Sequence, residues 1–367
     1  MAGLCLAPLL SRQGHNITVI EKRSVDGSSL EEVNPINVTI NASGREILKG
    51  LGILDNVKDV AVALTHRQAH HGNGEQAIQE YEPTTSGWLL SVKRSDLHAL
   101  LRSNARNEGT ILEYNTKLLS CRADGEALTL STSGAFQRRY FDLIVGADGA
   151  SSMVRQNLLQ RQRITCALNF LPWRYANFAI NAEECDKQSL NLKHLHIWSD
   201  EGVLGVGIPN CDGSISALLI FRDNSAQADV DAMHKGIKRI LGRYPNLSRW
   251  LRPLLKSSSP SIGRFLEVTL DRWYVGRIVT VGDACHAMYP FCGLGLNTAF
   301  EDVVELTRAL GKFSDLHVAL RRYDVLRRPA AELAQTKSRL QFSFLQDLIP
   351  GSLYSVESSQ GTLRSSG

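Results

Sequence analysis

The apolar positions of this 367-residue chain follow two alternating patterns. Short runs of β-branched and aliphatic residues, such as Ile17–Ile20 and Ile278–Val281, predict buried strands. Segments with an apolar residue every three or four positions predict helices. The clearest of them follows the second run, and one face of it is formed by Ala299, Val303, Leu306 and Leu310. This alternation predicts an α/β fold that contains a Rossmann-like domain.

The pattern changes between residues 165 and 265. Short apolar runs separated by turn residues (LHIW, VLGVGIPN, SALLIF) predict an antiparallel sheet there. Residues 316–349 are helical in pattern, and we expect a break at Pro329. We therefore predict a discontinuous Rossmann-like domain (1–63, 89–163 and 266–320), an interleaved domain with an antiparallel sheet (64–88 and 164–265) and a C-terminal helical region (321–367).

Composition narrows the functional classes. A hydrophobic content of 43% and a charged content of 21% are typical of a soluble globular protein. The net charge of +4 comes without a Lys/Arg run, which argues against a nucleic-acid partner. Seven scattered cysteines without a CxxC pair predict neither disulfides nor zinc. His66, His70 and His71 are interpreted as structural, and His194 and His196 as sheet surface, so we expect no metal.

The strongest candidate for chemistry is the strand, acidic turn, glycine loop and helix start at residues 278–297. Asp283, at the carboxyl end of the strand, can accept hydrogen bonds from a polyol. A helix start preceded by glycines offers backbone N–H groups and the positive end of a dipole, which suit phosphate or developing negative charge. An ordinary βα turn explains the pattern alone equally well. The candidate residues are Gly282, Asp283, Pro290, Gly293, Gly295, Leu296 and Asn297.

The N-terminus is typical of the second half of a dinucleotide-binding unit. Gly3–Arg12 predicts a helix, Ile17–Ile20 a strand, and Glu21 lies at its end, where an acidic residue binds ribose hydroxyls. Gly3 corresponds to the third glycine of GxGxxG, and the first strand and the start of that motif are missing. Either the sequence is a fragment or has a misassigned start, which we favour, or cofactor affinity has been lost.

Arg67 and Tyr81 are a candidate pair for a carboxylate. They are fourteen residues apart, so a hairpin with its turn near Gly72–Gly74 sets them side by side on adjacent strands. A guanidinium forks onto a carboxylate, and a phenol adds a donor. Taken alone, the pair is better explained as two surface residues on a hairpin.

The segment GDACHAMYPFCGLGLNTAFED resembles the second FAD-binding motif of the flavin aromatic hydroxylases, the p-hydroxybenzoate hydroxylase superfamily. The resemblance implies that Asp283 binds the ribityl chain of FAD, that Pro290 lies against the flavin ring and that the backbone of 293–297 faces the flavin O2. It implies FAD-related roles for further residues, which are Arg94 in an R-x-x-L-x-x-L-L setting and Asp148, Gly149 and Arg155 in a DG motif that serves the pyrophosphate.

Within that superfamily the chain is most similar to the kynurenine 3-monooxygenases, in INVTINASGREILKGLGI, the hairpin of Arg67 and Tyr81, LHIW…GIPN and the motif above. The resemblance implies that Arg67 and Tyr81 bind the kynurenine carboxylate. Gln341 replaces the substrate-contacting Asn of the family, and Leu294 and Leu296 stand where Gln and Met are usual. These departures leave open which kynurenine- or tryptophan-derived aromatic is the substrate.

The implied reaction is hydroxylation of an aromatic ring through a flavin C4a-hydroperoxide, with FAD as cofactor, NADPH or NADH as co-substrate and dioxygen as oxidant. Pro290 and Phe291 would wall the flavin, and no catalytic base is expected. The alternatives are another flavin hydroxylase or an epoxidase, or a truncated FAD-fold protein without turnover. We expect a cytoplasmic protein or one attached peripherally to an organelle membrane, because an apolar stripe runs near the end of the chain.

Overall fold

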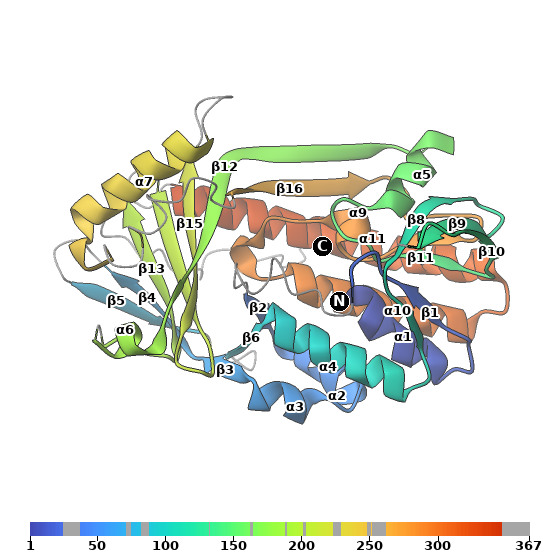
Figure 1. The fold of residues 1–367 in the computed structure, drawn as a ribbon, viewed down its shortest axis with the longest axis horizontal. Helices are drawn as coiled ribbons and strands as arrows, with labels where there is room; N and C mark the ends of the chain where they lie inside the picture. The colour runs from blue at the N-terminus through green and yellow to red at the C-terminus, as the bar shows by residue number, and fades with distance from the viewer. Residues whose placement is uncertain are drawn as a thin grey trace, which may run out of the picture.

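The computed structural model describes residues 1–24, 37–70, 75–81, 88–131, 133–161, 164–187, 189–200, 203–222, 229–247, 251 and 262–346. Its α/β architecture has two sides (Figure 1). A seven-stranded sheet with α7 (Asp229–Arg243) across it forms one side. Helices α1 (Ala2–Ser11), α4 (Arg94–Asn107) and α10 (Gly295–Lys312) gather on the other. The predicted fold class is confirmed.

The Rossmann-like side contains short parallel strand pairs. β1 (Thr18–Ile20) pairs with β7 (Ile111–Glu113), and β11 (Ile144–Gly146) pairs with β18 (Ile278–Thr280). The other edge of β18 pairs antiparallel with β17 (Tyr274–Val275). Helix α5 (Met153–Arg161) follows β11, and the short α9 (Asp283–His286) follows β18. The carboxyl ends of β11 and β18 therefore lie side by side, which is where ligands bind in parallel α/β sheets.

Two antiparallel sheets flank this region. One has the order β2 (Asn37–Ile40), β6 (Leu89–Lys93), β3 (Ala61–Leu64), and the other has β10 (Phe136–Tyr140), β9 (Glu126–Ser131), β8 (Thr116–Cys121). Helices α2 (Ala42–Gly50) and α3 (Leu54–Asp59) connect β2 to β3. The β2–α2 junction contacts the start of α10, so segments far apart in sequence meet there.

The seven-stranded sheet brings distant segments together. Its order is β16 (Ile262–Leu270), β12 (Cys166–Ile180), β15 (Ile215–Arg222), β14 (Val203–Pro209), β13 (His194–Asp200), β4 (His66–His70) and β5 (Gln76–Glu80). All neighbours are antiparallel except β13 and β4. The short α6 (Ala182–Lys187) and the 3-10 turn η2 (Pro245–Leu247) complete this side. The domain boundaries stay a prediction, and the one at 265 and 266 falls within β16.

Helix α11 (Leu316–Gln346) spans both sides as one helix (Figure 1). The predicted break at Pro329 is wrong, because Pro329 lies inside α11 on an exposed face. A proline removes one helical hydrogen bond, and on an exposed face water can bind the carbonyl that is left. Arg327 and Arg328 directly precede Pro329. Arg327 pairs with Asp302 of α10, and Arg328 pairs with Asp324 one turn before and Glu332 one turn after it, which holds this part of the helix in place.

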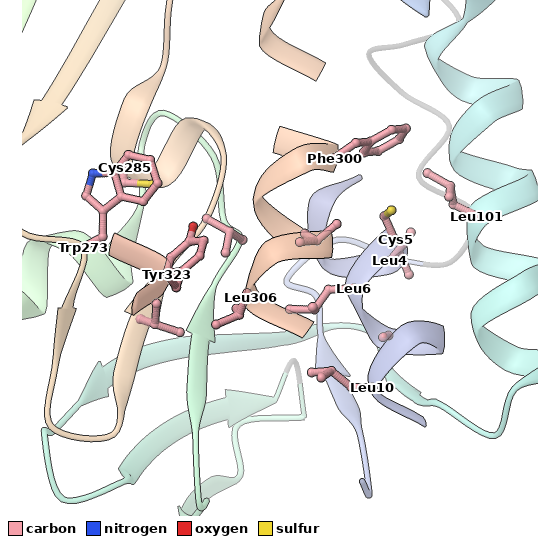
Figure 2. Close-up of a cluster of buried hydrophobic side chains, with 14 of the residues drawn as sticks. Leu4, Cys5, Leu6, Leu10, Leu101, Trp273, Cys285, Phe300, Leu306 and Tyr323 are labelled. Carbon is pink, nitrogen blue, oxygen red and sulfur yellow. The ribbon is translucent and has the colours of Figure 1, made fainter. Parts of the chain in front are cut away.

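The largest hydrophobic core lies between α1, α4, α10 and the β11–β18 pair. Figure 2 shows α1 packed between α10 and α4, with Leu4, Leu6 and Leu10 directed into the cluster. Each fully buried aliphatic or aromatic side chain contributes roughly 1.5–3 kcal/mol. Trp273, Cys285 and Tyr323 close this core on the side of α11 (Figure 2). The candidate cofactor turn is therefore built directly on the core.

Candidate active site

The acidic turn follows the buried strand β18. Gly282 has φ +60° and ψ −141°, and a Cβ at this position would lie 3.0 Å from the Cβ of Ala299. Only glycine combines that backbone with so close an approach to α10. Asp283 is the first residue of α9, and its side chain is exposed. None of the described residues donates a hydrogen bond to its carboxylate, which leaves the acceptors open for the hydroxyls of a sugar-like chain.

The glycine loop ends at the start of α10. Pro290, which is exposed, begins the 3-10 turn η3 (Pro290–Cys292), and Gly293 follows with φ +63°. A Cβ on Gly293 would lie 2.2 Å from Thr39 Oγ1, so the loop is held against β2. Gly295 and Leu296 are half-buried, and no side chain caps α10. Its first backbone N–H groups therefore remain available to an anionic group.

Asn297 holds the loop together. It is 2% exposed, and its Nδ2 donates to the carbonyls of Thr39 and Gly293, both at 2.9 Å. Its Oδ1 accepts from the backbone N–H of Asn41 at 3.0 Å. The side chain thus acts inside the protein, and only the backbone of Asn297 is left to face a cofactor, as the sequence resemblance implies.

Three predicted cofactor residues converge at the N-terminus of α1. Burial lowers the pKa of the Met1 amino group, and the positive charge of Arg94 lowers it further. The negative charges of Asp283 and Glu21 act on the same group in the opposite direction. Gly3 lies in the first turn of α1, where a Cβ would be 3.3 Å from the Cβ of Ala147. This close approach fits the helix-packing glycine of a dinucleotide site.

The DG motif has internal partners. Asp148 is exposed. Its carboxylate accepts from the backbone N–H groups of Met153 and Val154 at 2.6 and 3.1 Å, so it caps α5. Arg155 is 4% exposed and donates to the carbonyls of Ala284 and Ala150. Gly149 adopts φ +78° beside them. These residues tie α5 to the turn at 282–286, and their contact with a cofactor stays a prediction.

Arg67 and Tyr81 lie next to each other, as predicted from their spacing. Arg67 is on β4, opposite Gln79 of β5, and Tyr81 follows β5 directly. Arg67 Nε lies 3.3 Å from Tyr81 Oη, and the guanidinium carbon lies 5.0 Å from the ring centroid. Burial raises the pKa of Cys292, and the charge of Arg67 acts against that rise, so Arg67 lies in the neighbourhood of η3. The turn of this hairpin lies outside the described residues.

An aromatic wall packs the seven-stranded sheet against η3 and α11, and it consists of Trp173, Tyr175, Phe265, Phe291 and Phe342. The Phe291 and Phe342 rings stack with centroids 4.5 Å apart, and Phe265 is 5.2 Å from Phe291. Burial raises the pKa of Tyr175, and the charge of Arg94 opposes it, so the wall extends towards Arg94. Gln341, half-buried, precedes Phe342 on α11, and its contact with substrate stays a prediction.

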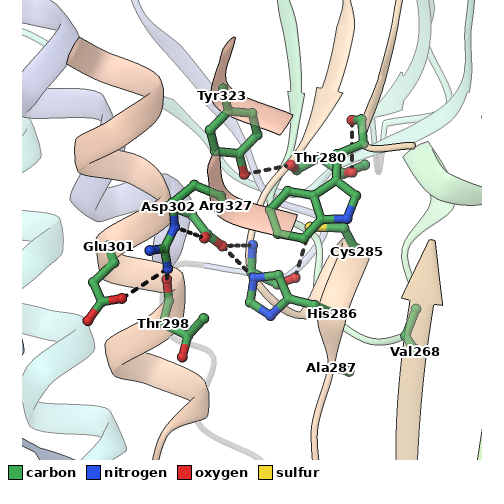
Figure 3. Close-up of polar contacts among 12 residues, drawn as sticks. Val268, Thr280, Cys285, His286, Ala287, Thr298, Glu301, Asp302, Tyr323 and Arg327 are labelled. Carbon is green, nitrogen blue, oxygen red and sulfur yellow. Dashed lines mark hydrogen bonds and ion pairs between the residues drawn. The ribbon is translucent and has the colours of Figure 1, made fainter. Parts of the chain in front are cut away.

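A buried charge network was missed by sequence reasoning. Asp302 of α10 is fully buried, pairs with Nε2 of His286, and accepts from Arg327 Nε at 2.9 Å (Figure 3). Asp302 falls on the apolar face that Ala299 and Leu306 define, at helical spacing. A carboxylate on such a face needs a buried partner. That pattern was the signal that could have revealed the network.

The histidines on β4 and β13 correct one expectation. His194 and His196 are 7% and 0% exposed, so they are not surface residues. His196 Nδ1 lies 2.9 Å from His70 Nε2, and burial lowers the pKa of His196 to about 4. Because side chains alternate along a strand, these histidines face α7, while Arg67 faces the opposite side. The described residues contain no group of three or more side chains suited to a metal.

Comparisons with known proteins show the family to which the chain belongs. A family model described as FAD binding domain matches residues 1–338. Kynurenine 3-monooxygenase from Salinispora tropica is 32% identical over 374 residues, covering 99% of this chain and 82% of the relative. The enzyme of the same name from Stenotrophomonas maltophilia is 31% identical over 363 residues, covering 95% and 78%.

Solved structures share the fold. 2-methyl-3-hydroxypyridine-5-carboxylic acid oxygenase has a TM-score of 0.77 at 21% identity, with 96% of this chain and 91% of that chain covered. p-Nitrophenol 4-monooxygenase from Pseudomonas putida has a TM-score of 0.76 at 20% identity, with 95% and 88% covered.

The fold and the comparisons together define a flavin-dependent monooxygenase that uses FAD as cofactor and NADPH or NADH as co-substrate. The chain belongs to the FAD-binding domain family, and proteins named kynurenine 3-monooxygenase are among its relatives. Within the described part of the chain, no helix combines the length and apolarity needed to cross a bilayer.

Proposed function

We propose that this monooxygenase hydroxylates the aromatic ring of kynurenine or of a close kynurenine- or tryptophan-derived amino acid. The observation that supports the proposal is the Arg67–Tyr81 pair, a cation and a phenol in contact beside η3. A guanidinium and a hydroxyl at this separation suit the two oxygens of a carboxylate. The relatives named kynurenine 3-monooxygenase support the same substrate class.

The residues of this chain divide the work between binding and exclusion of water. When bound, reduced FAD supplies the activated oxygen, and one oxygen atom of O₂ enters the ring while the other leaves as water with two electrons from NADPH. Arg67 and Tyr81 hold the carboxylate end. Phe291 and Phe342 provide an apolar wall against which a ring can pack, and they keep water away.

The N-terminus of α10 can stabilise negative charge that develops on the cofactor. The first turn of α10 presents uncapped N–H groups, and a helix N-terminus stabilises negative charge that develops in front of it. An amino group on an aniline-type ring already makes that ring electron-rich. A strong general base is therefore unnecessary in the proposed reaction.

The test is incubation of the purified chain with FAD, NADPH, dioxygen and L-kynurenine, with the product detected by mass. We expect a product heavier by one oxygen atom, and none in the absence of NADPH. An analogue without the carboxylate serves as the matched control, because it keeps the ring and removes the partner of Arg67. Consumption of NADPH that yields only peroxide with L-kynurenine and with related amino acids would reject the proposed substrate class.

The departures at Gln341, Leu294 and Leu296 make the kynurenine-derived analogues a necessary arm of this test. If Gln341 takes the place of the family's Asn, as the resemblance implies, its longer side chain would shorten the space for substrate beside α11. Turnover of a smaller or ring-substituted amino acid in preference to L-kynurenine would identify the analogue. Turnover of aromatics without any carboxylate, unaffected by Arg67→Ala, would favour another flavin hydroxylase or an epoxidase.

A further inference from the structure

Asp302 joins three elements around the turn that the cofactor needs. Its Oδ2 accepts from the backbone N–H of Gly282 at 3.1 Å and contacts His286 Nε2, and its Oδ1 accepts from Arg327 Nε at 2.9 Å (Figure 3). The carboxylate is fully buried. It therefore connects α10, α11 and the β18–α9 turn, with both oxygens engaged.

The network beyond Asp302 keeps its carboxylate ionised. Arg327 also donates to Glu301 Oε2 at 3.0 Å and to the carbonyl of Thr298 at 3.2 Å, which fixes the guanidinium against α10. Burial tends to raise the pKa of Asp302, but the charges of His286 and Arg327 prevail and lower it. An ionised carboxylate is a stronger acceptor than a neutral one, so the bond from Gly282 is charge-assisted.

Gly282 is held from both sides of its backbone. Its N–H donates to Asp302, and its carbonyl accepts from the backbone N–H groups of Cys285 and His286 at 2.9 and 3.0 Å. Asp283, the next residue, has an exposed carboxylate without a hydrogen bond from the described residues. The placement of Asp283 therefore depends on the backbone of Gly282 and not on contacts of its own side chain.

We propose that Asp302 is a positioning residue for FAD, which acts by fixing the Gly282 amide so that Asp283 presents its carboxylate to the cofactor. His286 and Arg327 are the two groups that hold Asp302 in this role. The inference depends on FAD binding, which the family establishes, and not on the identity of the aromatic substrate.

The main test is a double-mutant cycle on FAD affinity, with apoprotein titrated with FAD and flavin fluorescence as the signal. Asp302→Asn keeps the shape and removes the charge. Loss of a charge-assisted bond to the turn should weaken FAD binding by about 10- to 100-fold. If Asp302 acts through Asp283, Asp302→Asn should cause little further loss in an Asp283→Ala background, because coupled residues are not additive.

Asp324 offers a matched control. It is 7% exposed on α11, and its Oδ1 accepts from the backbone N–H of Trp273 and from Arg328 Nε, both at 3.3 Å. It thus makes the same kinds of contact with Trp273 and Arg328, and none with Gly282. Asp324→Asn should lower the melting temperature and leave FAD affinity unchanged. The proposal would be overturned if Asp302→Asn and Asp324→Asn lost FAD affinity in the same proportion to their loss of melting temperature. Additive effects of Asp302→Asn and Asp283→Ala in the double-mutant cycle would overturn it as well.

Arg327 provides a test should Asp302→Asn fail to fold. Arg327→Lys keeps a positive charge beside Asp302 and should bind FAD within a few-fold of the natural chain. Arg327→Gln removes the charge and should weaken FAD binding by about tenfold or more. Equal FAD affinity in the Lys and Gln variants would contradict the proposal, whatever substrate the enzyme accepts.

Discussion

The two sides of the active site are built on different physical principles. On the cofactor side, His286, Asp302 and Arg327 form a buried charge network in which both Asp302 oxygens are bonded. On the substrate side, stacked aromatic rings meet one cation–phenol contact, Arg67 to Tyr81 at 3.3 Å. Buried charges specify a single geometry, whereas apolar walls tolerate exchange at constant volume. Of the departures from the family pattern, Gln341 lies on the tolerant side next to Phe342, and Leu294 and Leu296 lie at the start of α10 on the cofactor side.

The largest expected effect comes from breaking the cofactor-side network. Arg327→Met leaves Asp302 buried with one cationic partner fewer, and removal of one member of a buried pair costs about 3–5 kcal/mol in the free energy of unfolding. Urea unfolding measures it. The double variant Arg327→Met/Asp302→Leu should recover a large part of the loss, and a double variant as unstable as the sum of the single ones would contradict this account.

The substrate side should respond in catalysis and not in stability. Arg67→Ala removes a half-buried cation whose described partner is Tyr81, so it should lower kcat/KM for an amino-acid substrate by about 10- to 100-fold. The melting temperature should change little. The control is the substrate analogue without a carboxylate, for which the variant and the natural chain should have the same kcat/KM. A matching loss on that analogue would assign Arg67 a structural role.

Tyr81→Phe isolates the phenol from the ring. The ring contact with Arg67 remains, and one donor to the carboxylate is lost, which should cost about 0.5–1.5 kcal/mol in transition-state binding, a loss of roughly 2- to 13-fold in kcat/KM. Steady-state kinetics on L-kynurenine measures it. A larger loss than that of Arg67→Ala would reverse the order of importance within the pair.

The smallest effect is a difference in pH dependence between histidines of the two sides. Burial alone would lower the pKa of His286, but the charges of Asp302 and Asp283 raise it above its ordinary value. The other charged group in this network is Arg327, which binds the second oxygen of Asp302. The contribution of His286 to stability is therefore complete below pH 6.5 and is lost as the pH rises through the raised pKa.

His196, on the substrate-side sheet, should behave in the opposite way. Burial lowers its pKa to about 4, and the facing groups are the other histidines, His70 and His194, together with the carbonyl of Asn191. The unfolded chain takes up this proton first, so stability should fall as the pH drops from 6.5 towards 4. The free energy of unfolding of the natural chain is compared with that of His286→Gln and of His196→Gln across pH 4–8. Each difference gives the pH dependence that the replaced histidine contributes, and contributions that change with pH in the same direction would contradict the comparison.

Local pattern was sufficient wherever neighbours in sequence are also neighbours in space. The strand at 278–281, the glycine loop and the helix behind it follow from β-branched runs, glycines and 3.6-residue periodicity, and the structure has β18, η3 and α10 there. The contact between Arg67 and Tyr81 follows from hairpin spacing, and the two side chains do meet. The α/β class follows from the alternation of such segments.

Tertiary structure alone decided the partners of buried polar groups. Asp302 meets His286 and Arg327 across 16 and 25 residues, and the His70–His196 contact spans 126. No local periodicity encodes such separations, because the energy comes from desolvated charges and hydrogen bonds that form only when distant elements pack. The continuity of α11 through Pro329 has the same origin, since ion pairs of Arg327 with Asp302 and of Arg328 with Glu332, across the proline, maintain a helix that propensity alone would end.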